Sequence, residues 1–131
     1  MKAVTLQTSG ENRGHYVPGM IAGGMLYISG QLSLDPVTRK VAEGGIREHM
    51  RQALANLDAV LCAAGVTRRD VVQCRVYIAG IGGWDDANDE YRNFFGDHKP
   101  ARIIVSTQEL HFGCLVEIEA VAECAQKGAE S

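Results

Sequence analysis

Residues 100–123, PARIIVSTQELHFGCLVEIEAVAE, contain two strand-like segments that both carry charged side chains. The first, 102–107, is rich in β-branched residues, a composition typical of strands. The second, 115–123, alternates between small or aliphatic side chains and glutamates, so its two faces differ in polarity. Its apolar face is Val116, Ile118, Ala120 and Ala122, and its polar face is Glu117, Glu119 and Glu123. This stretch predicts two strands of a sheet that has one buried face.

The charges in these two strands have three possible explanations. Period 2 places Arg102 on one face with Ile104 and Ser106, and Glu117 lies on the polar face of the next strand. An arginine and a carboxylate on neighbouring strands can form a structural ion pair, face solvent, or provide the binding and acid/base groups of a site. The strand pattern by itself favours the first two, because isolated charges on strands are usually solvated or paired.

The segments before residue 46 predict three further strands, of which 2–7 is the first. Gly23-Gly24 has the composition of a two-residue hairpin turn, so 21–22 and the segment from Met25 to Gln31 should pair. The second strand of this hairpin ends in Ser29-Gly30-Gln31. A glycine among polar residues there is expected where a ligand or another chain approaches the backbone.

Two amphipathic helices are expected later in the chain. Apolar residues recur at three- and four-residue steps from Ile46 to Ala64, and Gly65 follows as a C-terminal cap. A second helix should run from Trp84 to Phe95. Its acidic residues, 85–90, are interpreted as a solvated first turn near the positive helix terminus. Asn88 lies on the apolar stripe of this helix, which predicts a buried hydrogen-bonding role for its side chain rather than display at the surface.

Between the helices, residues 71–79 predict another strand, with one apolar and one polar face. The apolar face is Val72, Cys74, Val76 and Ile78, and the polar face is Gln73, Arg75 and Tyr77. Two helices can cover only one face of a sheet of five or six strands, so the expected fold is α+β with helices on one side. Oligomerisation through the open face would bury the face of the sheet that the helices leave uncovered.

The composition describes one ordinary globular domain rather than a nucleic-acid-binding or membrane protein. The chain has 131 residues, 46% of them hydrophobic and 22% charged, and a formal net charge of −3. Phosphate-backbone binding needs clustered Lys and Arg, which a weakly acidic chain does not provide. The apolar runs are shorter than a membrane span, and the first residues lack a signal pattern, so a cytoplasmic location is expected.

The cysteines and histidines do not predict a metal site. Their spacing has no C-x-x-C, H-x-x-x-H or mixed zinc pattern, and the cysteines are interpreted as small buried hydrophobic residues. They are Cys62, Cys74, Cys114 and Cys124, with His15, His49, His98 and His111.

Several short motifs occur in order along nearly the whole chain. They are Tyr16 with Gly19, Ser29-Gly30-Gln31, residues 56–61 and 63–65, residues 70–72, Asn88-x-x-Tyr91-x-x-Phe94-Phe95, Pro100-Ala101-Arg102 and residues 116–120. Together they resemble the RidA/YjgF family of enamine and imine deaminases, also called the endoribonuclease L-PSP family. The resemblance implies a chorismate-mutase-like mixed sheet of about six strands, with two helices on one face. It also implies one domain over 1–131, with a polar tail at 126–131, and a homotrimer with ligand clefts between subunits.

The same resemblance implies a role for particular residues. Arg102 matches the arginine that grips the substrate carboxylate, a task suited to a planar, permanently charged fork. Glu117 matches the glutamate that positions or activates the hydrolytic water. The remaining substrate-binding positions are Tyr16, Ser29, Gly30 and Ile104, with backbone groups near Gly30 and Ile104 orienting the imine nitrogen.

Three positions depart from the family pattern. Ile104 stands where the family commonly has cysteine, Pro18 where glutamine is common, and His111 where proline is frequent. Because these residues border the expected cleft and leave its anchor in place, they bear on the substrate more than on the reaction type.

The implied activity is hydrolysis of reactive 2-enamine or 2-imine acids to 2-oxo acids and ammonia, without metal or cofactor. Substrates of the 2-aminoacrylate, 2-iminopropanoate and 2-iminobutanoate type are expected. The alternatives are a deaminase of another pathway-specific enamine, or a trimer that binds a small metabolite without turnover. Members of the family are also described as ribonucleases or translation inhibitors. The acidic composition and the lack of a basic aromatic stripe make that function less favoured here.

Overall fold

One six-stranded mixed sheet and two helices make up the described part of the chain, residues 1–6 and 14–124 of a computed structural model. The strands are β1 (Lys2–Val4), β2 (Gly19–Ala22), β3 (Met25–Leu32), β4 (Val71–Ala79), β5 (Ala101–Thr107) and β6 (Val116–Glu123). The helices are α1 (Ile46–Ala63) and α2 (Trp84–Phe95), and the single-turn 3-10 segments are η1 (Arg68–Asp70), η2 (Ile81–Gly83) and η3 (His111–Gly113).

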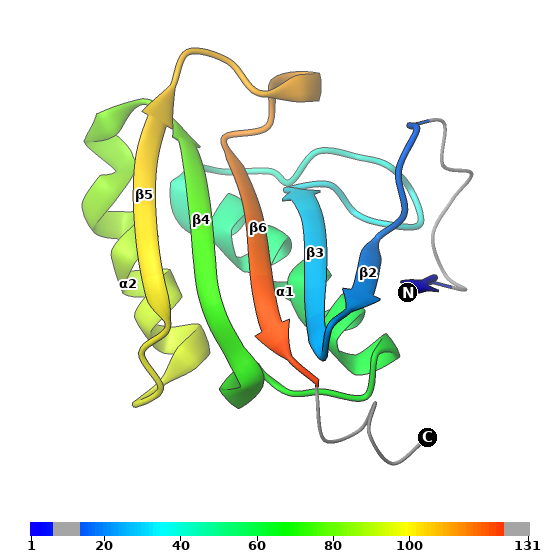
Figure 1. The fold of residues 1–131 in the computed structure, drawn as a ribbon. Helices are drawn as coiled ribbons and strands as arrows, with labels where there is room; N and C mark the ends of the chain where they lie inside the picture. Colours follow the sequence, from blue (N-terminus) through cyan, green and yellow to red (C-terminus); the bar gives the residue numbers. More distant parts are fainter. Residues whose placement is uncertain (7–13, 125–131) are drawn as a thin grey trace.

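The sheet order, β1-β2-β3-β6-β4-β5, places the last strand in the middle. β4 and β5 are parallel because α2 connects them, and the other neighbouring pairs are antiparallel. Both helices lie behind the sheet in Figure 1, so one face is covered and the other is open. The α+β fold with two helices on one side of a mixed sheet, expected from the sequence, is confirmed.

Local sequence signals explain how the elements begin and end. Gly23 and Gly24 have φ values of 58° and 75°, as a tight turn between β2 and β3 requires. Gly65 follows α1 with φ 76°, and the N–H of Val66 donates to the carbonyl of Leu61 at 3.0 Å, which closes the helix. The first strand is shorter than expected, since β1 ends at Val4, and residue 7 lies outside the described residues.

The hydrophobic core lies between the helices and the covered face of the sheet. α1 contributes six buried apolar residues, and β6 contributes alternate side chains, as its sequence pattern predicts. These residues are Met50, Ala53, Leu54, Leu57, Val60 and Leu61 from α1, and Val116, Ile118, Ala120 and Ala122 from β6. Burial of this apolar surface supplies the main driving force for folding.

A β-bulge at the start of β4 corrects one face assignment. The register between β4 and β6 shifts between Val71 and Gln73, so two residues of β4 occupy the space of one. As a result Val71 is buried and Val72 is 47% exposed, although period 2 placed Val72 on the apolar face. The alternation expected for Cys74, Val76 and Ile78 is confirmed from there on.

The acidic run of α2 contains a second correction, because Glu90 is only 6% exposed. Its carboxylate accepts hydrogen bonds from Arg51 at 2.9 and 3.1 Å and from Arg47 at 3.3 Å, which holds α2 against α1. The hydrogen bonds from Arg51 are the main reason that the pKa of Glu90 is lowered. The run is therefore not simply a solvated first turn.

The cysteine prediction is correct for three residues and wrong for one. Cys74, Cys114 and Cys124 are buried, whereas Cys62 is exposed on the outer side of α1. The helix turns each successive residue by about 100°, and Cys62 follows the buried Leu61 onto the solvent side. Among the described residues all four cysteines are free.

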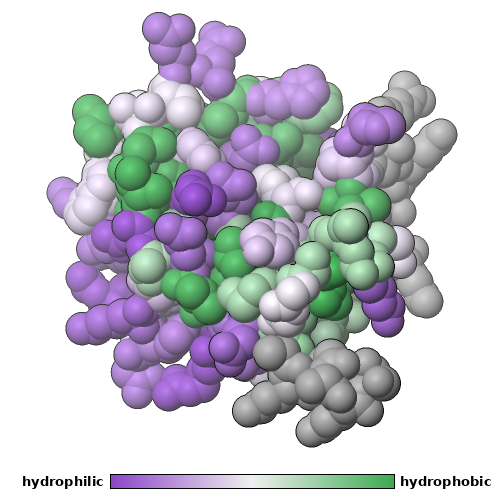
Figure 2. Space-filling model, viewed as in Figure 1, coloured by the Kyte–Doolittle hydropathy of each residue, from purple (hydrophilic) through white to green (hydrophobic). Residues whose placement is uncertain are grey.

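The open face of the sheet mixes polar and apolar side chains. Tyr27 and Ile103 are each 50% exposed, whereas Arg75 and Glu119 lie nearby on β4 and β6. Figure 2 shows this face, with hydrophobic patches between hydrophilic ones.

None of the helices in residues 1–6 and 14–124 is both long enough and apolar enough to cross a bilayer. The polar tail expected at 126–131 lies outside the described residues.

Candidate functional site

A cavity of about 1030 Å³ opens at the end of β3 and β6 and contains four of the predicted site residues. We call it the Glu117 cavity. The described residues that line it are Gly14, Tyr16, Ser29, Gly30, Leu32, Arg39, His111, Phe112, Glu117 and Glu119. The fold therefore places Tyr16, Ser29, Gly30 and Glu117 at one cavity, although at least 87 residues separate Glu117 from each of the other three.

Gly30 makes room for the carboxylate of Glu117. The pairing of β3 with β6 shifts between Ile28 and Gln31, so Ser29 and Gly30 lie at an irregularity of the ladder. A Cβ atom at position 30 would lie 2.5 Å from Glu117 Oε2. Glycine is the residue that lets this carboxylate lie against the β3 backbone.

The environment of Glu117 suits a proton acceptor. Burial is the main reason that the pKa of Glu117 is raised, and the nearby charge of Glu119 adds to the effect, whereas His111 opposes it. A carboxylate whose pKa moves toward neutral pH is a stronger general base. The chemistry that this cavity can support is therefore proton transfer to and from a bound water.

Glu119, which the alternation of β6 places on the same face as Glu117, is held by β4. Its Oε1 accepts a hydrogen bond from the Tyr77 hydroxyl at 2.7 Å, and Arg75 Nη1 lies 3.8 Å away. The hydrogen bond to Glu119 is the main reason that the pKa of Tyr77 is raised. These contacts fix Glu119, so Glu117 is the carboxylate with more freedom to act on a ligand.

Ser29 holds the loop that carries Tyr16. The Ser29 hydroxyl donates to the Val17 carbonyl at 2.6 Å, and the Ser29 N–H donates to the Pro18 carbonyl at 3.0 Å. The Tyr16 side chain remains 52% exposed beside the cavity. Ser29 therefore positions a cavity wall, and its hydroxyl oxygen can still accept a hydrogen bond.

Arg102 lies in a second, smaller cavity of about 460 Å³ between α2 and the edge strand β5. We call it the Arg102 cavity. Arg102 Nη1 donates to Asn88 Oδ1 at 2.7 Å, and its guanidinium lies 4.9 Å from the ring centre of Tyr91 and 5.6 Å from that of Trp84. The hydrogen bond predicted for Asn88 is confirmed, although its side chain is half-buried rather than buried. The guanidinium is oriented by these contacts but is not paired with a carboxylate among the described residues.

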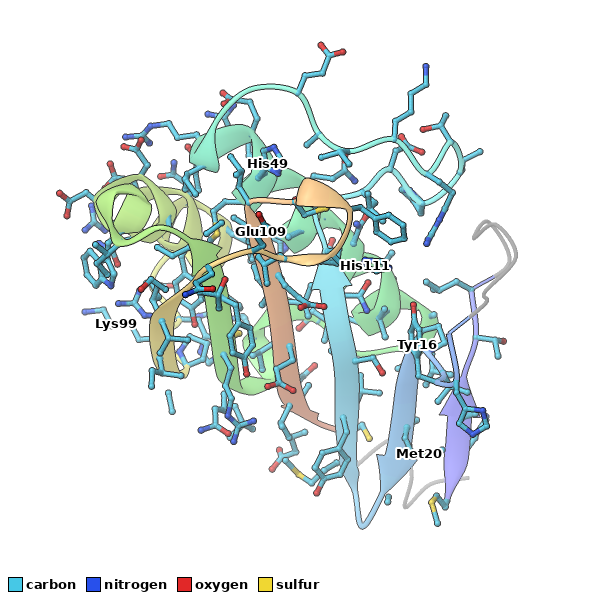
Figure 3. The ribbon with its side chains drawn as sticks, turned by 90° about the horizontal axis from the view of Figure 1, so that it is seen from above. Tyr16, Met20, His49, Lys99, Glu109 and His111 are labelled. Carbon is cyan, nitrogen blue, oxygen red and sulfur yellow. The ribbon has the colours of Figure 1, made fainter. Side chains whose placement is uncertain are left out.

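Arg102 and Glu117 lie on opposite faces of the sheet. Arg102 is in register with Cys74, which faces the helices, and Glu117 is in register with Tyr77, which faces the open side. Figure 3 also shows that Lys99, which lines the Arg102 cavity, lies near the opposite edge of the sheet from Tyr16, which lines the Glu117 cavity. One chain therefore does not bring the two predicted catalytic residues together.

Ile104 follows the face of Arg102, as period 2 predicts. It is in register with Val76, and its side chain packs against the core. It lines neither cavity, so only its backbone is available for a binding role.

Arg39 and Phe112 are among the lining residues of the Glu117 cavity that were not expected from the sequence. Both have positive φ, 65° and 62°, which is uncommon for residues with a side chain. The turn residues around Asp35-Pro36 are the only sequence signal near Arg39, and they do not indicate where its side chain lies.

No group of three or more possible metal ligands occurs within residues 1–6 and 14–124.

Known proteins are similar to this chain in sequence, and solved structures are similar to it in fold. A RutC family protein of Pyrococcus horikoshii is 38% identical over 109 residues, which are 83% of this chain and 86% of that protein. A Bos taurus protein named 2-iminobutanoate/2-iminopropanoate deaminase is also 38% identical over 109 residues, 83% of this chain and 80% of its own. The crystal structure of E. coli TdcF with bound serine matches with a TM-score of 0.87 at 29% identity, covering 94% of this chain and 98% of that chain.

The family model described as endoribonuclease L-PSP matches residues 7–124, nearly the whole chain. The match includes both cavities and every strand from β2 to β6. The chain therefore belongs to the RidA/YjgF family, the endoribonuclease L-PSP family.

Proposed function

We propose that this protein hydrolyses 2-enamine and 2-imine acids to 2-oxo acids and ammonia, in a site that two copies of the chain complete together. The observation that carries the proposal is the pair of cavities: one holds a carboxylate suited to proton transfer, and the other an oriented, unpaired guanidinium. A relative bearing the name 2-iminobutanoate/2-iminopropanoate deaminase supports the reaction, and TdcF with bound serine supports an amino-acid-like ligand.

Arg102 would bind the substrate carboxylate. Its planar fork can donate two parallel hydrogen bonds to a carboxylate, and Asn88 already fixes the direction of one nitrogen. The rings of Tyr91 and Trp84 restrict the guanidinium further. Such preorganisation lowers the entropy that is lost when the substrate binds.

Glu117 would hold and activate the water. Its carboxylate takes a proton from the water as the oxygen attacks C2 of the imine, and the imine nitrogen gains a proton to give a carbinolamine. A second proton transfer releases ammonia and leaves the 2-oxo acid, so one water is consumed per substrate. Backbone groups near Gly30 and Ile104 would orient the nitrogen. Since such imines already hydrolyse in water, positioning and modest acid/base catalysis suffice.

A homotrimer would bring the two cavities together. They lie toward opposite edges of one chain, so contact between them joins two different surfaces. Repeating such a contact closes a ring when the rotation allows it, and the family resemblance implies three copies. The open sheet face, with its half-exposed Tyr27 and Ile103, would be covered in the same assembly.

A coupled assay tests this function. Purified protein is added to a threonine or serine dehydratase, 2-oxo acid formation is followed, and semicarbazide traps the remaining imine. Faster 2-oxo acid formation with less trapping is expected. Arg102→Ala should abolish both effects, whereas the control Arg69→Ala removes an exposed arginine outside both cavities and should not.

The outcomes also separate the alternatives. Ligand binding that Arg102→Ala abolishes, without acceleration of any imine tested, would indicate a metabolite-binding protein. Acceleration with one enamine but not with the dehydratase products would indicate a different pathway substrate. RNA cleavage that survives Arg102→Ala and depends steeply on salt would replace the proposed function altogether.

A further inference from the structure

Arg39 and Phe112 are the two non-glycine residues with positive φ among residues 1–6 and 14–124, and both line the Glu117 cavity. They belong to loops that are 73 residues apart in the sequence. Residues held in sparsely populated backbone conformations cluster at ligand-binding sites, where the surrounding structure holds them. Their coincidence in one cavity indicates that their side chains serve the ligand.

The loop of Arg39 is held in place by its own hydrogen bonds. Leu34 and Val41 form an isolated bridge at its base, the Arg39 N–H donates to the Asp35 carbonyl at 2.9 Å, and the Asp35 N–H donates to the Lys40 carbonyl at 2.8 Å. A glycine at position 39 would adopt the same left-handed conformation without a side-chain clash. The backbone therefore does not require an arginine here.

The guanidinium of Arg39 is available to a ligand. Within residues 1–6 and 14–124 it forms neither an ion pair nor a side-chain hydrogen bond, although two carboxylates line the same cavity. One of these, Glu119, is already held by Tyr77 at 2.7 Å. An unpaired arginine at a cavity wall is suited to a carboxylate of the bound molecule.

Phe112 provides an apolar surface at the same cavity. It is 54% exposed, and its ring stacks on that of His111 with the ring centres 3.6 Å apart. Figure 3 shows His111 in the loop above the end of β3, toward the side that carries Tyr16. A ligand that reaches Arg39 could place a short hydrocarbon segment against this ring.

We propose that Arg39 binds a second acidic group of the substrate, so that the site prefers 2-imino dicarboxylic acids, the imines of acidic amino acids. This inference rests on the proposed function, in which Arg102 of a neighbouring copy takes the first carboxylate. Glu117 then acts at C2, between the two arginines. The cavity of about 1030 Å³ leaves ample space for the longer substrate, whereas a short monocarboxylic imine would leave Arg39 without a partner.

The test compares two imines that amino-acid oxidases generate in the assay, one from an acidic amino acid and one from alanine. Semicarbazide trapping gives kcat/KM for each. The variants are Arg39→Gly, Arg39→Lys and the control Lys40→Ala, which removes the adjacent charge outside the cavity lining. Arg39→Gly should lower kcat/KM for the dicarboxylic imine by at least about tenfold, as expected for a lost charged hydrogen bond.

Arg39→Gly should leave kcat/KM for the alanine-derived imine unchanged. Arg39→Lys should restore part of the lost activity, and Lys40→Ala should affect neither substrate. An equal loss for both imines, or no preference of the unaltered protein for the dicarboxylic one, would overturn the inference but not the proposed function.

If the unaltered protein accelerates neither imine, the proposed function fails and equilibrium binding decides the role of Arg39. The probes are a 2-oxo dicarboxylic acid and a 2-oxo monocarboxylic acid of similar length. Tighter binding of the dicarboxylic acid that Arg39→Gly abolishes would support Arg39 as the anchor. Equal binding of both acids, or binding that the substitution does not change, would contradict it.

Discussion

The carboxylate of Glu117 lies against the backbone of Gly30, at a point where a Cβ atom would be 2.5 Å from Oε2. The contact joins β3 to β6 where the register of the two strands shifts between Ile28 and Gln31. The position of the proposed base thus depends on the absence of a side chain on the neighbouring strand.

Gly30→Ala should therefore impair catalysis while the fold persists. The added methyl would displace the Glu117 carboxylate, and displacements of about 1 Å can cost roughly 100-fold in rate. We expect kcat/KM to fall at least about tenfold in the coupled assay. Gly82→Ala is the matched control, because a Cβ there meets nothing within 4 Å. Full activity of the Gly30→Ala protein would show that the position of Glu117 is not critical.

Glu117→Gln should remove activity and stabilise the protein at neutral pH. General base catalysis contributes about 100- to 10,000-fold, so a loss of this order in kcat is expected. The folded-state pKa of Glu117 is raised above 4.5, mainly by burial, so the folded protein holds this proton more tightly than the unfolded chain. Ionisation at neutral pH therefore opposes folding, and the glutamine variant avoids that cost.

Urea unfolding at several pH values checks the sign of this effect. The glutamine variant should be more stable than the unaltered protein at pH 7, and the difference should disappear as the pH falls well below 4.5, where Glu117 is protonated in both states. A difference that grows toward acid pH would mean that the folded-state pKa is lowered instead.

Mixing two inactive variants should restore activity if the site lies between copies. Arg102→Ala keeps Glu117, and Glu117→Gln keeps Arg102, so some contacts in mixed assemblies contain both groups. Co-refolding equal amounts should give about one quarter of the unmixed wild-type activity when each site draws on two neighbouring chains. Each variant refolded alone serves as the control. No recovery, with mixing verified by mass spectrometry, would place both residues in one chain's site.

Acid should destabilise the protein through His49, which is 3% exposed. Its Nδ1 lies 2.6 Å from Ser33 Oγ and accepts the Leu115 N–H at 3.2 Å, so protonation of that nitrogen would break the hydrogen bond from Leu115 and leave a buried positive charge. Burial lowers the pKa of His49 below 6.5, so its contribution to stability is present above pH 6.5 and is lost as the pH falls through the folded-state pKa.

The free energy of unfolding, measured in urea between pH 8 and pH 5, should therefore fall toward acid pH. His49→Ala should cost about 1–3 kcal/mol at pH 8, because two hydrogen-bonding groups lose their partner, and should flatten the pH dependence. His15→Ala, which alters an exposed histidine, should leave the slope intact. An unchanged slope in the His49 variant would assign the acid sensitivity to other groups.

Arg39→Gly should make the protein more stable even as it weakens the proposed dicarboxylate binding. The left-handed conformation at φ 65° is unfavourable for arginine and allowed for glycine. A gain of about 1 kcal/mol in the free energy of unfolding is expected. Lys40→Ala should give no such gain, and a loss of stability in Arg39→Gly would mean that the arginine contributes structural contacts.

The alternation of buried side chains in a strand and the positions of glycine turns could be predicted from the sequence, because both depend on the backbone conformation of neighbouring residues. The alternation of 115–123 decides which side chains of β6 are buried, and Gly23-Gly24 and Gly65 adopt the positive φ values that their turns require. The assignment of Val72 failed for a non-local reason. Whether a strand contains a bulge depends on the strand that pairs with it, which is β6 in this protein.

By itself, the sequence determined the element order, the α+β class, the family resemblance and the residues that should form a site. Only the tertiary structure decided that Tyr16, Ser29, Gly30 and Glu117 share one cavity while Arg102 lies on the opposite face. Periodicity assigns each side chain to a face of its own strand, but the relation between the faces of two strands depends on their register and on the crossover between them. The sequence also did not predict that Arg39 lines the cavity, because its position there depends on how its loop packs and not on any local pattern.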